Sequence, residues 1–142
     1  MRRLVSFVVM TGLLCVAVTV PALERSAAPE GAQVYIIAPV NGALVESPVT
    51  IKFGLRVMGV APAGVEVVGT GHHHLLIDLA ELPAMDQPLP ASAQVKHFGK
   101  GQTETSLELA PGVHSLQLLM GNHLHVPHQA PVISEKISIT VR

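Results

Sequence analysis

The residues best suited to chemistry in this chain are its eight histidines, which all lie between positions 72 and 128. They comprise a contiguous run of three, a His-X-His pair followed closely by a sixth, and two single residues: His72, His73, His74, His123, His125, His128, His97 and His114. Neutral imidazole is a ligand for zinc, copper and other transition metals. The chemistry that this concentration indicates is metal binding.

The spacing of the histidines predicts which of them share a face. On a strand, residues two apart point to the same side, so His72 and His74 should project together and His73 to the opposite side. His123 and His125 would likewise share a side if their segment is extended. Two such pairs on neighbouring strands would provide the three or four nitrogens that a transition metal needs.

The stretch around the last histidine is stiffened by proline. Pro127 fixes the backbone before His128 and biases Val126 towards an extended shape.

From the spacing and the number of histidines, the metal ligands that we predict are His72, His74, His97, His123, His125 and His128. The expected ion is copper or zinc, and the alternative for these residues is ordinary surface polarity without a metal.

Two histidines have structural roles in this interpretation. His73 shares its side with Leu75 and Ile77, so a packed position is predicted for it. His114 is in phase with Leu116 and is expected to be a strand-end residue with a satisfied hydrogen bond.

The first 22 residues have the layout of a secretory signal peptide. Arg2 and Arg3 precede an almost wholly apolar stretch, residues 4–20, and small residues follow at Val20-Pro21-Ala22. We expect cleavage after Ala22 and a periplasmic or secreted protein. A membrane anchor is the rival interpretation, because the apolar stretch approaches the length that spans a bilayer.

The only cysteine, Cys15, lies in this segment. A mature chain without it has no thiol, which excludes disulfides, thiolate nucleophiles, iron–sulfur clusters and cysteine-ligated zinc. The metal chemistry is therefore left to imidazole, with Asp78, Glu81, Asp86 or Glu104 as sources of an additional oxygen ligand or a base.

The remainder divides into a short polar leader, residues 23–33, which is expected to be flexible, and one domain, residues 34–142. The whole chain has a net charge of −1 and contains no Trp and one Tyr. Loss of Arg2 and Arg3 makes the mature part more acidic. This composition has neither the basic face nor the stacking rings of a nucleic-acid-binding protein. We expect no membrane span in the mature chain.

Short apolar runs separated by Pro and Gly are typical of an all-β domain. Strands are predicted at 34–37, 49–57, 65–68, 72–79, 104–109, 113–120 and 132–141. The 104–109 and 113–120 strands are predicted to form a hairpin, and Glu135 suggests a bulge or an edge position in the last strand. Residues 78–93 form a proline-containing surface loop of the kind that often carries function.

The predicted fold is a small Ig-like antiparallel β-sandwich. Four sequence blocks resemble those of a known family, and they are GHHHLLID at 71–78, HFGKGQTE at 97–104, HLHVPH at 123–128 and SEKI at 134–137. With these blocks the chain, over 34–141, resembles the exported bacterial family catalogued as domain of unknown function 4399. The resemblance implies a periplasmic or secreted β domain and brings no established activity. Asn122 stands where the resemblance leads us to expect aspartate.

Three functions are compatible with these observations. The favoured one is a histidine-rich domain that binds copper or zinc for storage, delivery or stabilisation, with the metal and a periplasmic protein as candidate partners. The second is a metalloenzyme in which three imidazoles leave an open position and Glu104 or Asp78 acts as a base. The third is a metal-free interaction domain. Binding is favoured over catalysis because the sequence contains no known hydrolase motif.

Overall fold

The computed structural model describes Leu23 and residues 25–142, and every regular element in that part of the chain is a strand. The strands are β1 (Gln33–Ala38), β2 (Leu44–Val45), β3 (Val49–Arg56), β4 (Gly59–Val60), β5 (Thr70–Ile77), β6 (Val95–His97), β7 (Glu104–Leu107), β8 (Gly112–Gly121) and β9 (Ile137–Val141). The predicted signal peptide lies outside the described residues. Within them, no helix is long and apolar enough to span a membrane.

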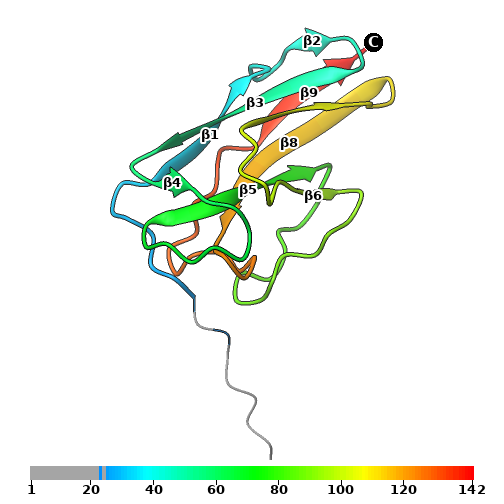
Figure 1. The fold of residues 1–142 in the computed structure, drawn as a ribbon. Coiled ribbons are helices and arrows are strands. Elements are labelled where there is room, and N and C mark those ends of the chain that lie inside the picture. The colour runs from blue at the N-terminus through cyan, green and yellow to red at the C-terminus, as the bar shows by residue number, and fades with distance from the viewer. Residues whose placement is uncertain (1–22, 24) are drawn as a thin grey trace, which may run out of the picture.

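The strands form two sheets (Figure 1). One sheet has the order β1-β3-β7, and the other has the order β2-β9-β8-β5-β4, with β6 also paired to β5. Most pairs are antiparallel, whereas β2 with β9 and β4 with β5 are parallel. The all-β class and the two mainly antiparallel sheets are confirmed, and the Ig-like sandwich stays a prediction.

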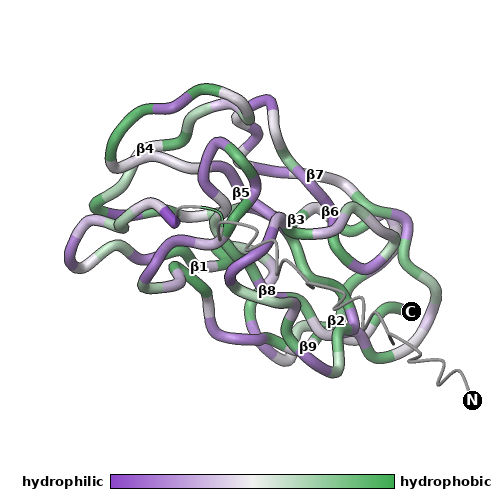
Figure 2. The backbone as a smooth tube through the Cα atoms, turned by 90° about the horizontal axis from the view of Figure 1, so that it is seen from below, coloured by the Kyte–Doolittle hydropathy of each residue, from purple (hydrophilic) through white to green (hydrophobic). Residues whose placement is uncertain are grey.

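The main core lies between the two sheets because each sheet has one apolar face. In β3 the residues Val49, Ile51 and Phe53 are buried while Thr50 and Lys52 alternate with them on the exposed side. The opposite sheet contributes alternate residues of β5, β8 and β9, including Leu75, Ile77, Leu116, Leu118, Met120, Ile139 and Val141. Figure 2 shows hydrophobic stretches along the strands and many hydrophilic stretches in the surrounding loops.

β5 is buried on both of its faces, which is unusual for a strand of a two-sheet domain. Its inner side faces the main core, and its outer side is covered by the loop between β5 and β6, which was predicted at 78–93. A second apolar cluster forms there, made of Leu76, Leu89, Val95 and Leu119. This loop therefore packs on the sheet and shields the outer face of β5 from water.

The predicted hairpin between 104–109 and 113–120 is wrong. β7 pairs with β3 in one sheet, whereas β8 pairs with β5 and β9 in the other. The turn at Ala110-Pro111-Gly112 therefore crosses between sheets. Alternation of apolar residues identifies each strand but cannot identify its partner, because pairing depends on distant segments.

Other boundaries also differ from the expectation. Residues 65–68 are not a strand, and the short strands β2, β4 and β6 were not predicted. The last strand begins only at Ile137, and Leu119 forms an isolated bridge with Ile133 before it. The irregular stretch between these points contains Glu135, where a bulge or edge position was expected.

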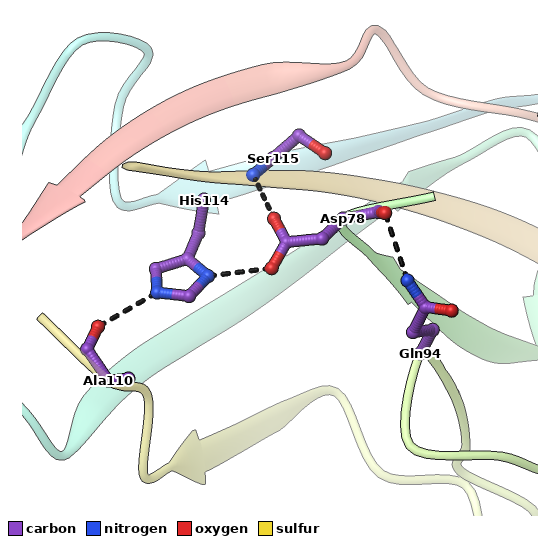
Figure 3. A network of polar contacts seen from close by, with 5 residues as sticks. All are labelled: Asp78, Gln94, Ala110, His114 and Ser115. Atoms are coloured by element: carbon purple, nitrogen blue, oxygen red, sulfur yellow. Dashed lines mark hydrogen bonds and ion pairs between the residues drawn. The ribbon is translucent and has the colours of Figure 1, made fainter. Parts of the chain in front are cut away.

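His114 has the structural role that its position predicted. Its Nδ1 lies 2.7 Å from Asp78 Oδ2 and its Nε2 lies 2.8 Å from the carbonyl oxygen of Ala110 (Figure 3). The backbone N–H of Ser115 donates to the other carboxylate oxygen of Asp78. The Ala110 carbonyl, and then Asp78, raise the pKa of His114, because both neighbours accept hydrogen bonds from the protonated ring.

This contact predicts a pH-dependent contribution to stability. Because the folded-state pKa is raised, the contribution is complete below about pH 6.5 and is lost as the pH rises through the folded-state pKa. Asp78→Asn keeps the side-chain shape and should lower the free energy of unfolding by about 1 kcal/mol at pH ~6 and by less at pH ~9. Urea unfolding at the two pH values measures this, with the exposed Asp86→Asn as control. Equal losses at both pH values would contradict it.

Candidate metal centre

Four histidines from three separate segments converge on the outer face of the larger sheet. His72 and His74 project from the outer side of β5, as their spacing predicted. His97 lies at the end of β6, directly opposite His74 in the strand register. His125 comes from the turn that follows β8 and faces the same point. These four residues are called the histidine cluster below.

The rings of the histidine cluster are mutually close. All six distances between ring centroids lie between 4.6 and 6.1 Å. One ring nitrogen each from His72, His74 and His97 lies within 4.8 Å of the others. No other group of three or more His, Cys, Asp or Glu side chains in the described part of the chain is arranged to share an ion.

These separations fit a single ion surrounded by imidazoles. With a metal–nitrogen bond of about 2.0–2.1 Å, tetrahedral coordination places ring centroids about 5 Å apart and the nitrogens about 3.3 Å apart. The centroids already match this spacing. The nitrogens of His72, His74 and His97 lie within 4.8 Å of one another and need to approach by up to about 1.5 Å, which changes of side-chain torsion can provide.

The most buried rings of the cluster have no hydrogen-bond partner. His72 and His74 are 0% and 1% exposed, and both nitrogens of each ring are unpaired among the described residues. An unsatisfied buried polar atom costs about 1–3 kcal/mol. His73 in the main core is unpaired as well, but only His72 and His74 face further imidazoles, so the partner that their arrangement indicates is a metal ion, which satisfies one nitrogen of each ring.

Electrostatics hold these rings in the neutral, metal-binding form. Burial, followed by the neighbouring imidazoles of His125 and His97, lowers the pKa of His72 to about 4. Burial and then His72 lower the pKa of His74 to about 3. The pKa of His97 is also lowered, first by burial and then by His125. At neutral pH each of these rings therefore has one nitrogen with a free lone pair for a cation.

Gly121 and Gly99 have no side chain, and this leaves room for the rings of His74 and His97. A Cβ built on Gly121 would lie 2.7 Å from Cε1 of His74, and a Cβ on Gly99 would lie 2.3 Å from Cε1 of His97. Neither distance is sterically possible, so only glycine is compatible with these ring positions. Neither glycine was among the predicted site residues.

The turn after β8 aims His125 at the cluster. The side-chain oxygen of Asn122 accepts hydrogen bonds from the backbone N–H groups of Leu124 and Val126, which forms an Asx turn. His125 has a φ of 67° within this turn, and its carbonyl accepts a hydrogen bond from Leu89 N–H of the long loop. An aspartate at position 122 would accept the same two bonds, so the loop geometry does not require its charge.

The same turn separates His125 from His123. The segment is not extended, so the two side chains do not share a side as expected. His123 lies beside the cavity described below, with its Nε2 3.9 Å from Glu66 Oε2. Of the six predicted ligands, the structure brings four together and places His123 elsewhere.

His128, the sixth predicted ligand, lies behind the cluster. It is buried, and its Nε2 lies 3.3 Å from the carbonyl oxygen of Thr70. Its pKa is lowered by burial, and it in turn helps to lower that of His72, so the two rings are near neighbours. A Cβ on Gly71 would come within 3.0 Å of its ring. His128 therefore packs against Thr70 and Gly71 of β5, next to the histidine cluster but outside it.

His73 points away from the cluster, as predicted. It lies in the main core with its ring centroid 5.1 Å from that of Phe53. Burial lowers its pKa to about 4, against a weaker opposing effect of the backbone at Gln102. It is unavailable to an ion on the outer face.

The segment predicted as a leader contacts the loop that bears the last histidines. The Arg25 guanidinium donates hydrogen bonds to the carbonyl oxygens of Pro127 and His128. Asn122 Nδ2 donates to Ser26 Oγ, and Gln129 N–H donates to the Ser26 carbonyl. A cavity of about 510 Å³ lies beside these contacts. Its lining residues are Arg25, Ser26, Ala27, Val65, Glu66, Val67, Val68, Gly69, Thr70, Asn122, His123, Leu124 and Gln129.

The lowered pKa values predict that the metal-free protein is destabilised by acid. For His72, His73 and His74 the stabilising contribution is complete above about pH 6.5 and is lost as the pH falls towards about 4. Each histidine contributes at most about 1.4 kcal/mol per pH unit in that window. The urea midpoint should therefore fall steadily from about pH 7 to about pH 4. A constant midpoint across this range would refute the buried, neutral state of these rings.

Comparison with known proteins gives one match. The family model described as "Domain of unknown function (DUF4399)" matches residues 51–142, which include every member of the histidine cluster. No curated protein and no solved structure matches the chain. Because the match covers more than half of the sequence, the chain belongs to the DUF4399 family, as the four sequence blocks indicated.

Proposed function

We propose that this protein is an exported domain that binds one copper or zinc ion through the histidine cluster. The observation that supports it best is the pair of fully buried rings, His72 and His74, whose nitrogens are unpaired and face two further imidazoles. Imidazoles gain little from one another when neutral and repel one another when protonated. A shared cation gives their convergence a physical reason.

Binding is favoured over catalysis by the surroundings of the cluster. Asp78, one candidate base, is engaged with His114 and Ser115. Glu104, the other candidate base, lies in β7 and is paired with Lys52 of β3. Both strands belong to the sheet that does not carry the histidine cluster. A metal-assisted hydrolysis needs an open position and a nearby base. Neither predicted base reaches the site, so a metalloenzyme is the weaker alternative.

The exposure of the cluster suits an ion that enters and leaves. His97 is exposed and His125 is partly exposed, whereas His72 and His74 are buried beneath them. An ion can therefore be captured first by His97 and His125 and then be held by the buried pair. This arrangement supports storage or delivery in the periplasm or outside the cell, the location that the N-terminal 22 residues predict.

A metal-free interaction domain remains the third candidate. It is supported by the cavity of about 510 Å³ beside Arg25 and His123, which is large enough for a small ligand. This alternative does not account for the unpaired nitrogens of the histidine cluster, so we place it behind metal binding.

Metal addition should stabilise the protein. An ion that binds only the folded state at 100 times its dissociation constant adds about 2.7 kcal/mol, which raises the melting temperature by about 10 °C. His97→Ala should weaken binding by about 100-fold or more, since even partners of ligands change affinity by about 10–100-fold. Calorimetric titration and melting curves of the protein without a histidine tag measure both effects.

Two other histidines provide matched controls for this experiment. His123→Ala and His114→Ala each remove one imidazole outside the histidine cluster, so they should leave the stoichiometry at one ion and the affinity unchanged. If no copper or zinc species alters the melting temperature, metal binding is refuted. A loss of affinity in His123→Ala equal to that in His97→Ala would place the site elsewhere.

The space at Gly99 offers a test that leaves all ligands in place. Gly99→Ala forces the His97 ring to move, because the new methyl group would lie 2.5 Å from its Nε2. We expect metal affinity to fall by about tenfold or more, and the metal-free melting temperature to fall modestly, since the methyl group also comes within 3.0 Å of Ala63 Cβ. Gly59→Ala is the control, because its Cβ meets only the side chain of Thr70, at 3.2 Å. Unchanged affinity in Gly99→Ala would remove His97 from the ligand set.

A further inference from the structure

We propose that the histidine cluster selects monovalent copper over zinc and over divalent copper. This inference rests on the proposed function and names the ion that the site takes. It is drawn from three properties of the described residues, namely the charge of the ligand set, the burial of the site and the arrangement of its rings.

The ligand set is electrically neutral. The ring nitrogens of His72, His74 and His97 group together without any carboxylate of the described residues, and the ring of His125 lies 4.6–6.1 Å from theirs as a fourth imidazole. Glu66 is 78% exposed and lies beside His123, which is outside the cluster. A bound ion would therefore keep its whole charge, because no thiolate or carboxylate is present to offset it.

Burial makes that uncompensated charge costly. The cost of transferring an ion from water into a low-dielectric interior rises with the square of its charge, so a divalent ion costs about four times as much as a monovalent ion of the same size. His72 and His74 are nearly inaccessible to water, and an apolar cluster of Leu76, Leu89 and Leu119 lies on the same face. The site therefore discriminates against a double charge.

The ring arrangement separates the two oxidation states of copper. Square-planar coordination, which Cu(II) prefers, would give four centroid distances of about 4.5 Å and two of about 6.3 Å between opposite rings. Only one long distance is present, 6.1 Å between His74 and His125. The pair that would have to be opposite, His72 and His97, is 4.9 Å apart. Tetrahedral coordination, which suits Cu(I) and Zn(II), fits better.

Zinc shares the tetrahedral geometry, so charge decides between it and Cu(I). Zinc sites with three histidines retain a water molecule that loses a proton and supplies a negative charge. Four imidazoles close the coordination shell and leave no place for that water. Zn(II) would thus remain fully divalent in this site, whereas Cu(I) brings a single charge.

Competition titrations with chelators of known affinity test the proposal. The untagged protein is titrated with Cu(I) under anaerobic, reducing conditions and separately with Zn(II) and Cu(II). The dissociation constant for Cu(I) should be lower than those for both divalent ions by about a thousandfold or more. His97→Ala should weaken Cu(I) binding, which shows that the histidine cluster is the site measured.

A single charge change tests the electrostatic reason directly. Asn122→Asp preserves the side-chain oxygen that accepts the two hydrogen bonds of the turn. It also adds a buried carboxylate next to Gly121, where a Cβ would lie 2.7 Å from Cε1 of His74. The preference for Cu(I) over Zn(II) should fall by about tenfold or more. Asn41→Asp is the control, because the Asn41 side-chain oxygen also accepts a backbone hydrogen bond, from Ser138, and lies outside the cluster. It should leave the preference unchanged.

The possible results separate this inference from the proposed function. Tightest binding of Cu(I), reduced in selectivity by Asn122→Asp alone, supports both. Equal or tighter binding of Zn(II) or Cu(II) overturns the preference for Cu(I) and leaves metal binding intact. An unchanged preference in Asn122→Asp overturns the electrostatic reason. Failure of all three ions to bind overturns both.

Discussion

The structure depends on the burial of imidazoles on the outer face of a central strand. β5 packs its inner side on the main core and its outer side under two loops, so His72 and His74 lose contact with water. The unpaired nitrogens of these rings are destabilising by themselves. The fold tolerates this cost because the neighbouring apolar clusters hold β5 in place, and a bound cation would reduce it by satisfying one nitrogen of each ring.

Three loops complete the site that β5 begins. The long loop covers Leu76 and bonds to the carbonyl of His125, the Asx turn at Asn122 directs that histidine inwards, and the Arg25 segment fixes the chain beyond it. β5 supplies the buried ligands, and the end of β6 and the turn after β8 supply the accessible ones. A site divided in this way combines defined geometry with a route for the ion.

The histidines of this protein also show how surroundings determine the behaviour of one side chain. Burial without partners lowers the pKa of His72 and His74, whereas two hydrogen-bond acceptors raise that of His114. Burial also lowers the pKa of His73, which packs beside Phe53 in the main core and points away from the histidine cluster. The same residue type thus gives ligand candidates, a packing residue and a strand-end hydrogen bond.

By itself, the sequence determined the all-β class, the strand that bears the histidine triplet and the opposite directions of His73 and its neighbours, because alternation along a strand is a local property. Only the tertiary structure decided that His97 and His125 join the pair on β5, that His123 does not, and that β7 and β8 belong to different sheets. These facts depend on strand pairing and on a turn formed by the Asn122 side chain, which bring together residues distant in sequence. No periodicity along the chain encodes such contacts.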